Sequence, residues 1–368
     1  MSLLADKGKG KSALKVNEGV EQPSAVNDNA ISRFKTIKRK KYTIDELVTG
    51  ITNGDRSLLS RAITLLESNL AEHQNKSEAV VDGCMPYSGN SIRVGITGVP
   101  GVGKSTFIES LGCFLTDLGH KVAVLAIDPS SGKSKGSILG DKTRMEKLSA
   151  NENAFIRPSP SAGSLGGVAR KTRESIILCE AAGFDVILIE TVGVGQSEIA
   201  VHSMADFFLL LMLAGAGDEL QGIKRGIMEM ADMITITKAD SGNERNAIRA
   251  KSEYQNAVHL FPKPDSGWPV KVAVCSSKDN TGIDKIWENI ISYQQFSNAN
   301  GYFKNRRKSQ SIYWMNESIE QQLMCCFYTT TGMKEEVEKY EKLVEEKKMT
   351  SFHAAGELLA EYFKRIGK

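Results

Sequence analysis

Short apolar runs alternate with segments of helical periodicity through the middle of the chain. We predict strands over residues 92–97, 122–127, 155–156, 186–189, 207–213, 233–237 and 270–274, and helices between them centred on residues 106–118, 142–150, 167–182, 223–230, 245–258 and 283–296. Nearly continuous apolar strands that alternate with helices are typical of a mostly parallel sheet covered by helices on both faces. The pattern therefore predicts an α/β fold.

Helical patterns also flank this region. On the N-terminal side we expect helices over residues 44–51 and 56–70, the second with Asp55 as its N-cap, and then a polar stretch over residues 72–90. On the C-terminal side a long helix is predicted, followed by two charged helices over residues 335–348 and 352–366. The long helix carries an apolar stripe of Ile312, Met315, Ile319, Leu323 and Phe327. Such a stripe predicts either packing on the same chain or a contact between subunits, because amphipathicity does not identify the covering surface.

Composition narrows the choice of partners. The 368 residues carry a net charge of +3, with 41% hydrophobic and 25% charged residues, as expected for a globular protein. So small a net charge gives no reason to expect nucleic acid. The longest apolar run, residues 207–214, is far shorter than the roughly 20 residues of a membrane span, so no membrane partner is expected. The six cysteines lack metal-finger spacing and the N-terminus lacks an apolar signal region, which predicts a cytoplasmic location.

A glycine-rich stretch, GITGVPGVGKST, joins the first predicted strand to the helix after it. Residues 98–105 fit the pattern G-x-x-x-x-G-K-[ST] in the strand-to-helix context that a phosphate-binding loop requires. Glycines let successive backbone N–H groups turn toward phosphates, and the helix N-terminus adds partial positive charge. We expect Lys104 to reach the β- and γ-phosphates and the Ser105 hydroxyl to ligate Mg²⁺. The predicted nucleotide contacts of this loop are Gly98, Val99, Pro100, Gly101, Val102, Gly103, Lys104, Ser105 and Thr106.

A Mg²⁺–nucleotide site also needs acidic side chains at the carboxyl ends of neighbouring strands. Glu190 and Asp128 each follow a predicted strand, and Asp141 lies a little further along the chain. Carboxylate oxygens are the ligands that Mg²⁺ prefers. The predicted metal ligands are Ser105, Asp128, Asp141 and Glu190.

The sequence TKAD at residues 237–240 indicates which base is bound, because it is a variant of the [NT]KxD element of GTP-binding proteins. A carboxylate at Asp240 can accept from both N1–H and the exocyclic amine of guanine, whereas adenine offers neither donor in that geometry. The stem of Lys238 can lie on the base plane. Thr237 stands where many such proteins have asparagine, a departure that could weaken this corner of the pocket. A loop after the next strand, where GTPases contact guanine O6, supplies Ser276, Ser277 and Lys278. GTP and GDP are the predicted nucleotides.

Several of these segments together resemble one family, the methylmalonyl-CoA-mutase-associated GTPases of the MeaB/ArgK type. The matching segments are residues 95–106, 126–131, 136–145, 156–160, 165–168 and 189–198. The likeness runs from about residue 44 to the C-terminus and is most specific between residues 92 and 240. It implies a P-loop NTPase fold with a mostly parallel sheet flanked by helices. It also implies a cytosolic homodimer that binds GTP and Mg²⁺ and assists an adenosylcobalamin-dependent acyl-CoA mutase.

By its composition at the N-terminus, which lies outside the likeness, and by this resemblance from there on, the chain divides into four parts. They are a disordered polar leader (1–42), an N-terminal helical arm (43–90), a GTP-binding G domain (91–297) and a helical C-terminal dimerisation extension (298–368). The magnesium-site acids of the family fall on Asp128, Asp141 and Glu190.

A glycine-flanked loop over residues 214–226 occupies the position of a third switch in the family. We hypothesise that docking of a partner brings Lys224 or Arg225 to the γ-phosphate, where a cation can raise the rate by about 10³–10⁵. Gln196 is a candidate for positioning water, although it lies further along the chain than the corresponding glutamine of Ras-like proteins. The predicted catalytic residues are Lys104, Glu190, Lys224 and Gln196.

Two other functions fit parts of the sequence. A nickel-insertion metallochaperone GTPase belongs to the same broad class, but the expected Cys/His ligands near the phosphate loop and a His-rich leader are missing from the sequence. An ATP-using kinase of a transport system would require adenine binding, which the Asp240 carboxylate opposes. A comparison of GTP with ATP binding tests the kinase alternative. Metal analysis tests the metallochaperone alternative.

Overall fold

The structure is a computed structural model that describes residues 42–68, 70–127, 145–158, 165–191, 197–215 and 225–367. From Ile44 onward the chain forms one compact unit. The predicted leader lies outside the described residues apart from its last position, so its disorder stays a prediction.

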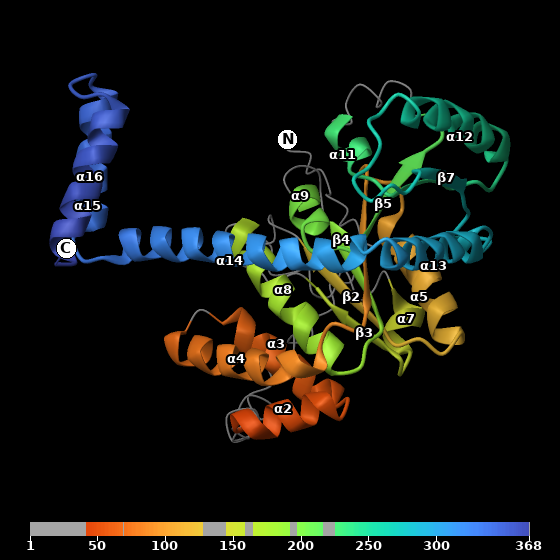
Figure 1. Cartoon of the computed structure of the whole chain (residues 1–368), viewed down its shortest axis with the longest axis horizontal. Coiled ribbons are helices and arrows are strands. Elements are labelled where there is room, and N and C mark those ends of the chain that lie inside the picture. The colour runs from red at the N-terminus through yellow and green to blue at the C-terminus, as the bar shows by residue number, and fades with distance from the viewer. Residues whose placement is uncertain are drawn as a thin grey trace, which may run out of the picture. The chain divides into compact units, whose positions relative to one another are not determined.

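A seven-stranded sheet forms the centre of this unit (Figure 1). Its strands are β1 (Ile92–Gly98), β2 (Val122–Ile127), β3 (Ala154–Arg157), β4 (Val186–Thr191), β5 (Phe207–Leu213), β6 (Met233–Thr237) and β7 (Lys271–Val274). They lie in the order β3-β2-β4-β1-β5-β6-β7, and every neighbouring pair is parallel. The predicted α/β fold is therefore confirmed, and strand ends differ from the predicted ones by no more than two residues.

Helices cover both faces of the sheet, as the apolar strands require. They are α5 (Lys104–Asp117), α7 (Glu146–Ala150), α8 (Leu165–Ala181), α9 (Ser197–His202), α11 (Arg225–Glu229), α12 (Glu244–Val258) and α13 (Ile283–Ala299). Phe107 of α5 and Tyr293 of α13 are buried in the core of one face. Tyr254 of α12 is buried on the other face. Helix α9 packs closely on β1, since a Cβ at Gly95 of β1 would lie only 2.7 Å from the side chain of Val201 in α9.

The N-terminal arm contains one more helix than the pattern predicts. Its helices are α2 (Ile44–Thr52), α3 (Arg56–Glu67) and α4 (Ala71–Cys84), and a 3₁₀ turn follows at Met85–Tyr87. Asp55 caps α3 as expected, since its carboxylate accepts from the N–H groups of Ser57 and Leu58. The stretch expected to be a polar connection is largely α4. Its buried stripe is narrow, consisting of Ser77, Val80 and Cys84, so the apolar period is too weak to recognise.

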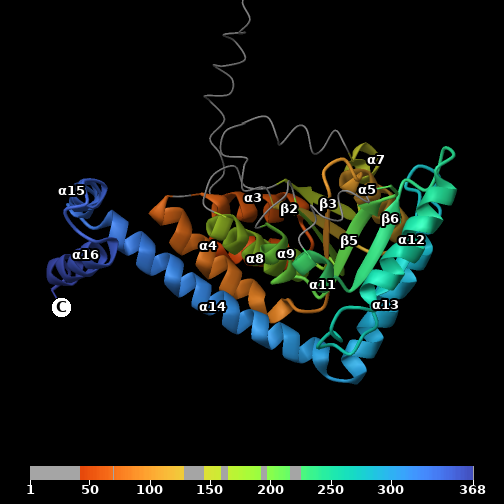
Figure 2. The same ribbon diagram turned by 90° about the horizontal axis from the view of Figure 1, so that it is seen from above.

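Three helices complete the C-terminal region (Figure 2): α14 (Tyr302–Thr329), α15 (Met333–Glu345) and α16 (Ser351–Arg365). One side of α14 packs on the rest of the unit: Arg173 of α8 pairs with Glu317, and the indole of Trp314 donates to the carbonyl of Ser203. Four residues of the predicted apolar stripe are exposed, namely Ile312, Met315 (56% accessible), Ile319 and Leu323 (60%), whereas Phe327 is half-buried and its ring packs against Tyr362 of α16. Among the helices that the structure describes, none is both long and apolar enough to cross a membrane.

Buried ion pairs lie at the amino ends of the strands. We call this set the amino-end network; it consists of Arg93, Glu180, Asp206, Asp232, Arg306 and Arg307. Arg93 donates to both carboxylate oxygens of Glu180, at 2.9 and 3.0 Å. Arg307 of α14 likewise contacts both oxygens of Asp206, at 2.8 and 2.6 Å. The network therefore joins α14 to the sheet.

Candidate nucleotide-binding site

The loop between β1 and α5 has a backbone that its glycines make possible. Gly101 and Gly103 have φ values of +75° and +93°, in the left-handed region that favours glycine. A Cβ at Gly98 would lie 2.5 Å from the carbonyl oxygen of Leu211, closer than real Cβ contacts allow. Val102 is 1% exposed and fixes the loop to the core. The loop is therefore built as a phosphate-binding loop would be, directly ahead of a helix N-terminus.

Lys104 is held inside this loop. Its ammonium group donates to the carbonyl of Gly98 at 2.9 Å. Burial lowers the pKa of Lys104, and the carboxylates of Glu190 and Glu198 oppose that shift. The ammonium group thus lies in a partly desolvated place, with one neutral oxygen as a hydrogen-bond partner and two acids nearby. A phosphate oxygen could replace that carbonyl with little rearrangement, because a charge-assisted bond is the stronger one.

Glu198 was predicted only as the last residue of a segment that resembles the family, without a role of its own. It lies near the start of α9 and is 3% exposed. The signal that the sequence offered for Glu198 was a carboxylate eight residues after Glu190 and two residues after Gln196.

The Ser105 hydroxyl and Glu190 meet at the carboxyl end of the sheet. The hydroxyl donates to Oε1 of Glu190 at 3.1 Å, and Glu190 is 5% exposed. A hydroxyl and a carboxylate are hard oxygen donors of the kind that Mg²⁺ accepts, so this pair fits the predicted ion. Asp128 and Asp141 lie outside the described residues. Within the described ranges, no group of three or more His, Cys, Asp or Glu side chains could hold a metal.

The TKAD element adjoins the phosphate loop. The Thr237 hydroxyl donates to the carbonyl of Val102 at 2.8 Å, so the residue expected to weaken this corner instead ties β6 to the loop. Lys238 has a φ of +55°, and its ammonium group donates to the carbonyl of Gly101 at 2.7 Å. The structure therefore brings Thr237 and Lys238 together with the glycines of the loop.

Asp240 faces the loop that follows β7. Its Oδ2 accepts from the Ser276 hydroxyl at 2.7 Å, and this bond is the main cause that lowers the pKa of Asp240. Lys278 reaches the hydroxyl of Ser241, while the carbonyl of Ser277 accepts from Ser110 of α5. The carboxylate is thus held ionised, as an acceptor for two N–H donors must be.

These elements enclose a cavity of about 190 Å³. It is lined by Val102, Gly103, Thr106, Thr237, Lys238, Asp240, Ser277 and Lys278. All eight were predicted nucleotide contacts, drawn from three segments up to 176 residues apart (278 minus 102).

Comparison with known proteins agrees with this geometry. The family model for the methylmalonyl Co-A mutase-associated GTPase MeaB matches residues 59–331. The chain belongs to this family. It is 47% identical to the GTPase ArgK of Escherichia coli over 77% of this chain and 85% of that protein. It is 43% identical to the mouse protein named methylmalonic aciduria type A homolog, mitochondrial, over 89% of this chain and 81% of that one.

A solved structure shares the fold of this MeaB-family chain. The crystal structure of an LAO/AO transport system kinase superposes with a TM-score of 0.70 at 36% identity, covering 89% of this chain and 99% of that one. The chain is therefore a P-loop GTPase of the MeaB family. Its predicted residues Lys224 and Gln196 lie outside the described residues, and the side chain of Arg225 does too, so their roles stay predictions.

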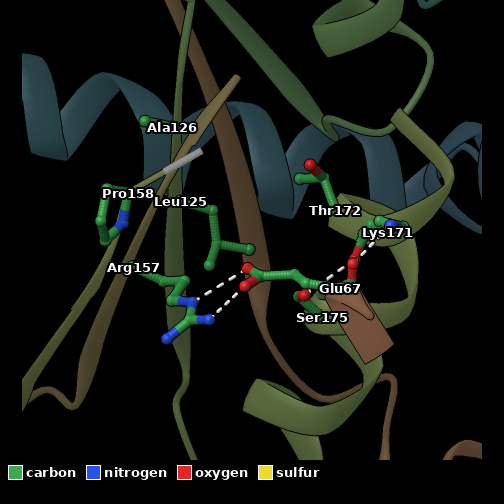
Figure 3. Close-up of a pocket in the computed structure, with 8 residues that line it drawn as sticks. All are labelled: Glu67, Leu125, Ala126, Arg157, Pro158, Lys171, Thr172 and Ser175. Atoms are coloured by element: carbon green, nitrogen blue, oxygen red, sulfur yellow. Dashed lines mark hydrogen bonds and ion pairs between the residues drawn. The ribbon is translucent and has the colours of Figure 1, made fainter. Parts of the chain in front are cut away.

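The structure adds one contact to the MeaB-family segment at residues 156–160, which the sequence analysis matched without assigning a role. Figure 3 shows Arg157 of β3 directed at the carboxylate of Glu67 in the N-terminal arm. Arg157 Nε donates to Oε1 of Glu67 at 2.9 Å, and Lys171 of α8 donates to the backbone carbonyl of Glu67 at 2.6 Å. The arm is therefore fixed to the carboxyl end of β3.

Proposed function

We propose that this GTPase assists an adenosylcobalamin-dependent acyl-CoA mutase, most simply methylmalonyl-CoA mutase, by gating the loading, protection or reactivation of its cofactor. Membership of a family whose name specifies association with that mutase is the observation that carries the proposal. The GTP-bound state would have one affinity for the mutase and the GDP-bound state another, so hydrolysis would act as a timer.

In the proposed site the phosphate loop and Lys104 bind the phosphates, and Asp240 selects guanine. Ser276, Ser277 and Lys278 close the base pocket. Ser105 and Glu190, joined by Asp128 and Asp141, would hold Mg²⁺, which when bound neutralises charge on the phosphates. Hydrolysis itself adds water to the γ-phosphorus, breaks its bond to the β–γ bridging oxygen and leaves GDP and inorganic phosphate. The convergence of Ser105 with Glu190 supports this ligand set.

The rate of hydrolysis would depend on the partner. Lys224 or Arg225 would approach the γ-phosphate when the mutase docks, and Gln196 would orient water. The idea fails if the Lys224→Ala and Arg225→Ala proteins keep full stimulation of turnover by the mutase.

The protein would act as a cytoplasmic homodimer. Its six cysteines are all free, as expected in a reducing compartment. The exposed stripe of α14 would form the subunit contact: Ile312 is 50% and Ile319 49% accessible, and large exposed apolar surfaces mark interaction sites. Light scattering of the wild type and of Leu323→Asp tests this part, and a monomeric wild type would contradict it.

Two measurements test the function itself. A titration with GTP, GDP and ATP should show guanine nucleotides bound in strong preference, and equal binding of ATP would support the kinase alternative. Capture of purified mutase by the protein loaded with a non-hydrolysable GTP analogue or with GDP should then differ between the two states. Equal failure of both states to retain the mutase would refute the partner, without affecting the assignment of the nucleotide.

A further inference from the structure

A second, larger cavity lies at the β7 edge of the sheet. Its volume is about 650 Å³, against about 190 Å³ for the nucleotide cavity. It is lined by Met233, Ile248, Lys251, Gln255, Val258, His259, Val270, Lys271, Val272, Ala273, Val274, Lys285 and Asn289. The floor is therefore the edge strand β7, and the walls are α12 on one side and α13 on the other. We call this cavity the β7 groove. Its size falls within the range of about 300–1,000 Å³ that is typical of binding pockets.

The backbone of β7 offers hydrogen bonds to the groove. The N–H of Cys275 donates inward to Ile236 of β6, and alternate residues of a strand direct their backbone groups to opposite sides. Val272 and Val274 therefore direct their N–H groups away from β6, toward the open edge, because β7 is the last strand of the sheet. An edge of this kind can accept an added strand.

The charge of the β7 groove has one sign. Lys251, Lys271 and Lys285 line it together with His259, and its lining contains no aspartate or glutamate. Lys271 donates to the side chain of Asn289 at 2.8 Å and lies over the ring of Trp268, so its ammonium group is held on the α13 side. The remaining lining is mainly apolar. Charge complementarity therefore favours an acidic occupant that also has apolar side chains.

The two walls differ, and the difference specifies a pattern. On the α12 side the groove presents Ile248, which is 61% exposed, and Val258, together with Lys251, Gln255 and His259, beside the face where Val272 is buried. On the α13 side it presents Lys271 and Lys285. A strand places successive side chains on opposite faces. The large apolar side chains therefore lie on the α12 side, beside Lys251, whereas the α13 side presents two lysines and Asn289. An added strand would thus meet the apolar side chains at every second residue and only polar side chains, lysines among them, at the residues between.

We propose that the β7 groove binds an extended segment of a partner protein in which apolar residues alternate with glutamate or aspartate. The segment adds to β7 as an eighth strand, with its backbone on the outward N–H and C=O of Val272 and on the outward N–H of Val274; the carbonyl of Val274 itself lies against Gly282. Its acidic side chains face Lys271 and Lys285, and its apolar side chains cover Ile248. This site is separate from the nucleotide cavity and does not depend on which mutase the protein serves.

The test uses a fluorescein-labelled seven-residue peptide that alternates valine with glutamate. Fluorescence anisotropy with the full chain should give saturable binding with a Kd well below about 1 mM. Lys271→Glu/Lys285→Glu should weaken binding at least about tenfold, because it reverses both charges on one wall. The matched control Lys308→Glu/Lys334→Glu changes two exposed lysines of α14 and α15 and should leave binding unchanged.

Hydrogen exchange separates strand addition from simple ionic attraction. The bound peptide should slow exchange of the Val272 and Val274 amides, and a version N-methylated at alternate residues should bind at least about tenfold more weakly. Absence of binding up to about 1 mM peptide overturns the proposal. The lysines would then serve to prevent edge strand β7 from pairing with other chains. Binding without protection of these amides, or equal binding of inorganic phosphate at the same lysines, overturns it as well.

Discussion

The two ends of the central sheet are both rich in charged and polar groups, but the groups are used differently. At the carboxyl end the ammonium groups of Lys104 and Lys238 each donate to a single loop carbonyl. At the amino end Arg307 contacts both oxygens of Asp206 and also the carbonyls of Gly89 and Ser91. Each of these two lysines has one neutral hydrogen-bond partner, whereas Arg307 at the other end has a carboxylate and two carbonyls as partners.

This difference separates a binding site from a structural one. A buried ion pair is costly to break, because removal of one partner leaves a desolvated charge. A lysine bonded to one carbonyl can exchange that bond for a phosphate oxygen at small cost, since the new bond is charge-assisted. Substitutions at the amino end should therefore affect folding, and those at the carboxyl end should affect ligand binding.

The largest effect is expected for Asp206→Ala. Asp206 is 1% exposed and accepts from Arg307 and from the backbone N–H of Arg93. Its removal should lower the free energy of unfolding by about 3–5 kcal/mol, measured by urea denaturation. The fraction that remains folded should bind GDP with unchanged affinity. Asp206→Asn keeps an acceptor for the Arg93 N–H and should lose less. A fall in GDP affinity without a loss of stability would contradict the assignment of a structural role to the amino end of the sheet.

Lys104→Ala should have the opposite profile. The affinity for GTP should fall about 100-fold or more, since a hydrogen bond to a charged group contributes about 1.5–3 kcal/mol and this lysine is expected to contact two phosphates. The free energy of unfolding should not fall, because burial disfavours the charged form of Lys104 and its removal therefore costs the folded state little. Isothermal titration and urea denaturation measure the two quantities. The matched control is Lys121→Ala, at the exposed residue just before β2, which should alter neither quantity. Unchanged affinity for GTP would show the phosphate-loop assignment to be wrong.

Acid should weaken the amino end through His202. Its Nε2 accepts from Arg306 at 3.1 Å, and burial, followed by the charge of Arg306, lowers its pKa from 6.5 to about 4. The unfolded chain therefore binds a proton at His202 more readily than the folded one. The stability that neutral His202 contributes is complete above pH 6.5 and is lost as the pH falls toward 4.

Asp232 changes stability in the other direction. Burial raises its pKa from 3.8 to about 6, despite the opposing charge of Arg306, so the folded chain binds this proton more readily than the unfolded one. Its contribution to stability increases as the pH falls through about 6 toward 3.8.

The pH dependences of stability that arise from His202 and from Asp232 partly cancel in the wild type. His202→Gln should remove the first of them while keeping an acceptor for Arg306. Relative to the wild type, the variant should gain about 1–2 kcal/mol on going from about pH 8 to about pH 5. Urea denaturation at both pH values measures this gain. If the free energies of unfolding of the variant and the wild type differed by the same amount at both pH values, His202 would be excluded as the titrating group.

The carboxyl end was far more predictable from sequence than the amino end. The phosphate loop and the TKAD element are contiguous, so the constraint that each places on backbone or charge is visible in a few adjacent letters. The pairing of Asp206 with Arg307 spans 101 residues and leaves no local pattern. Arg157 and Glu67 are likewise 90 residues apart.

Secondary structure was also predictable only where a local pattern of residues marks it. Strands buried on both faces are recognisable because most of their residues are apolar, and in β5 all of them are. Helix α4 was missed because only a narrow stripe of it is buried. The role of Thr237 was also hidden, because its bond to Val102 depends on how β6 meets a loop 135 residues earlier.

The smallest expected effect concerns how the base pocket is prepared before the nucleotide arrives. Ser276 is fully buried, and its hydroxyl donates to Asp240 while accepting from the N–H of Asp279. Ser276→Ala should raise the Kd for GTP about fivefold, because a lost hydrogen bond of ordinary strength leaves the carboxylate less well oriented. The affinity for ATP should not change, so the preference for guanine should fall by the same factor. The matched control is Ser292→Ala in α13, because this serine is exposed, lies outside the nucleotide cavity and donates to the carbonyl of Glu288 in its own helix; it should keep wild-type affinity. An equal loss for GTP and ATP would mean that Ser276 supports the phosphate loop instead of the Asp240 carboxylate, to which we assign the recognition of guanine.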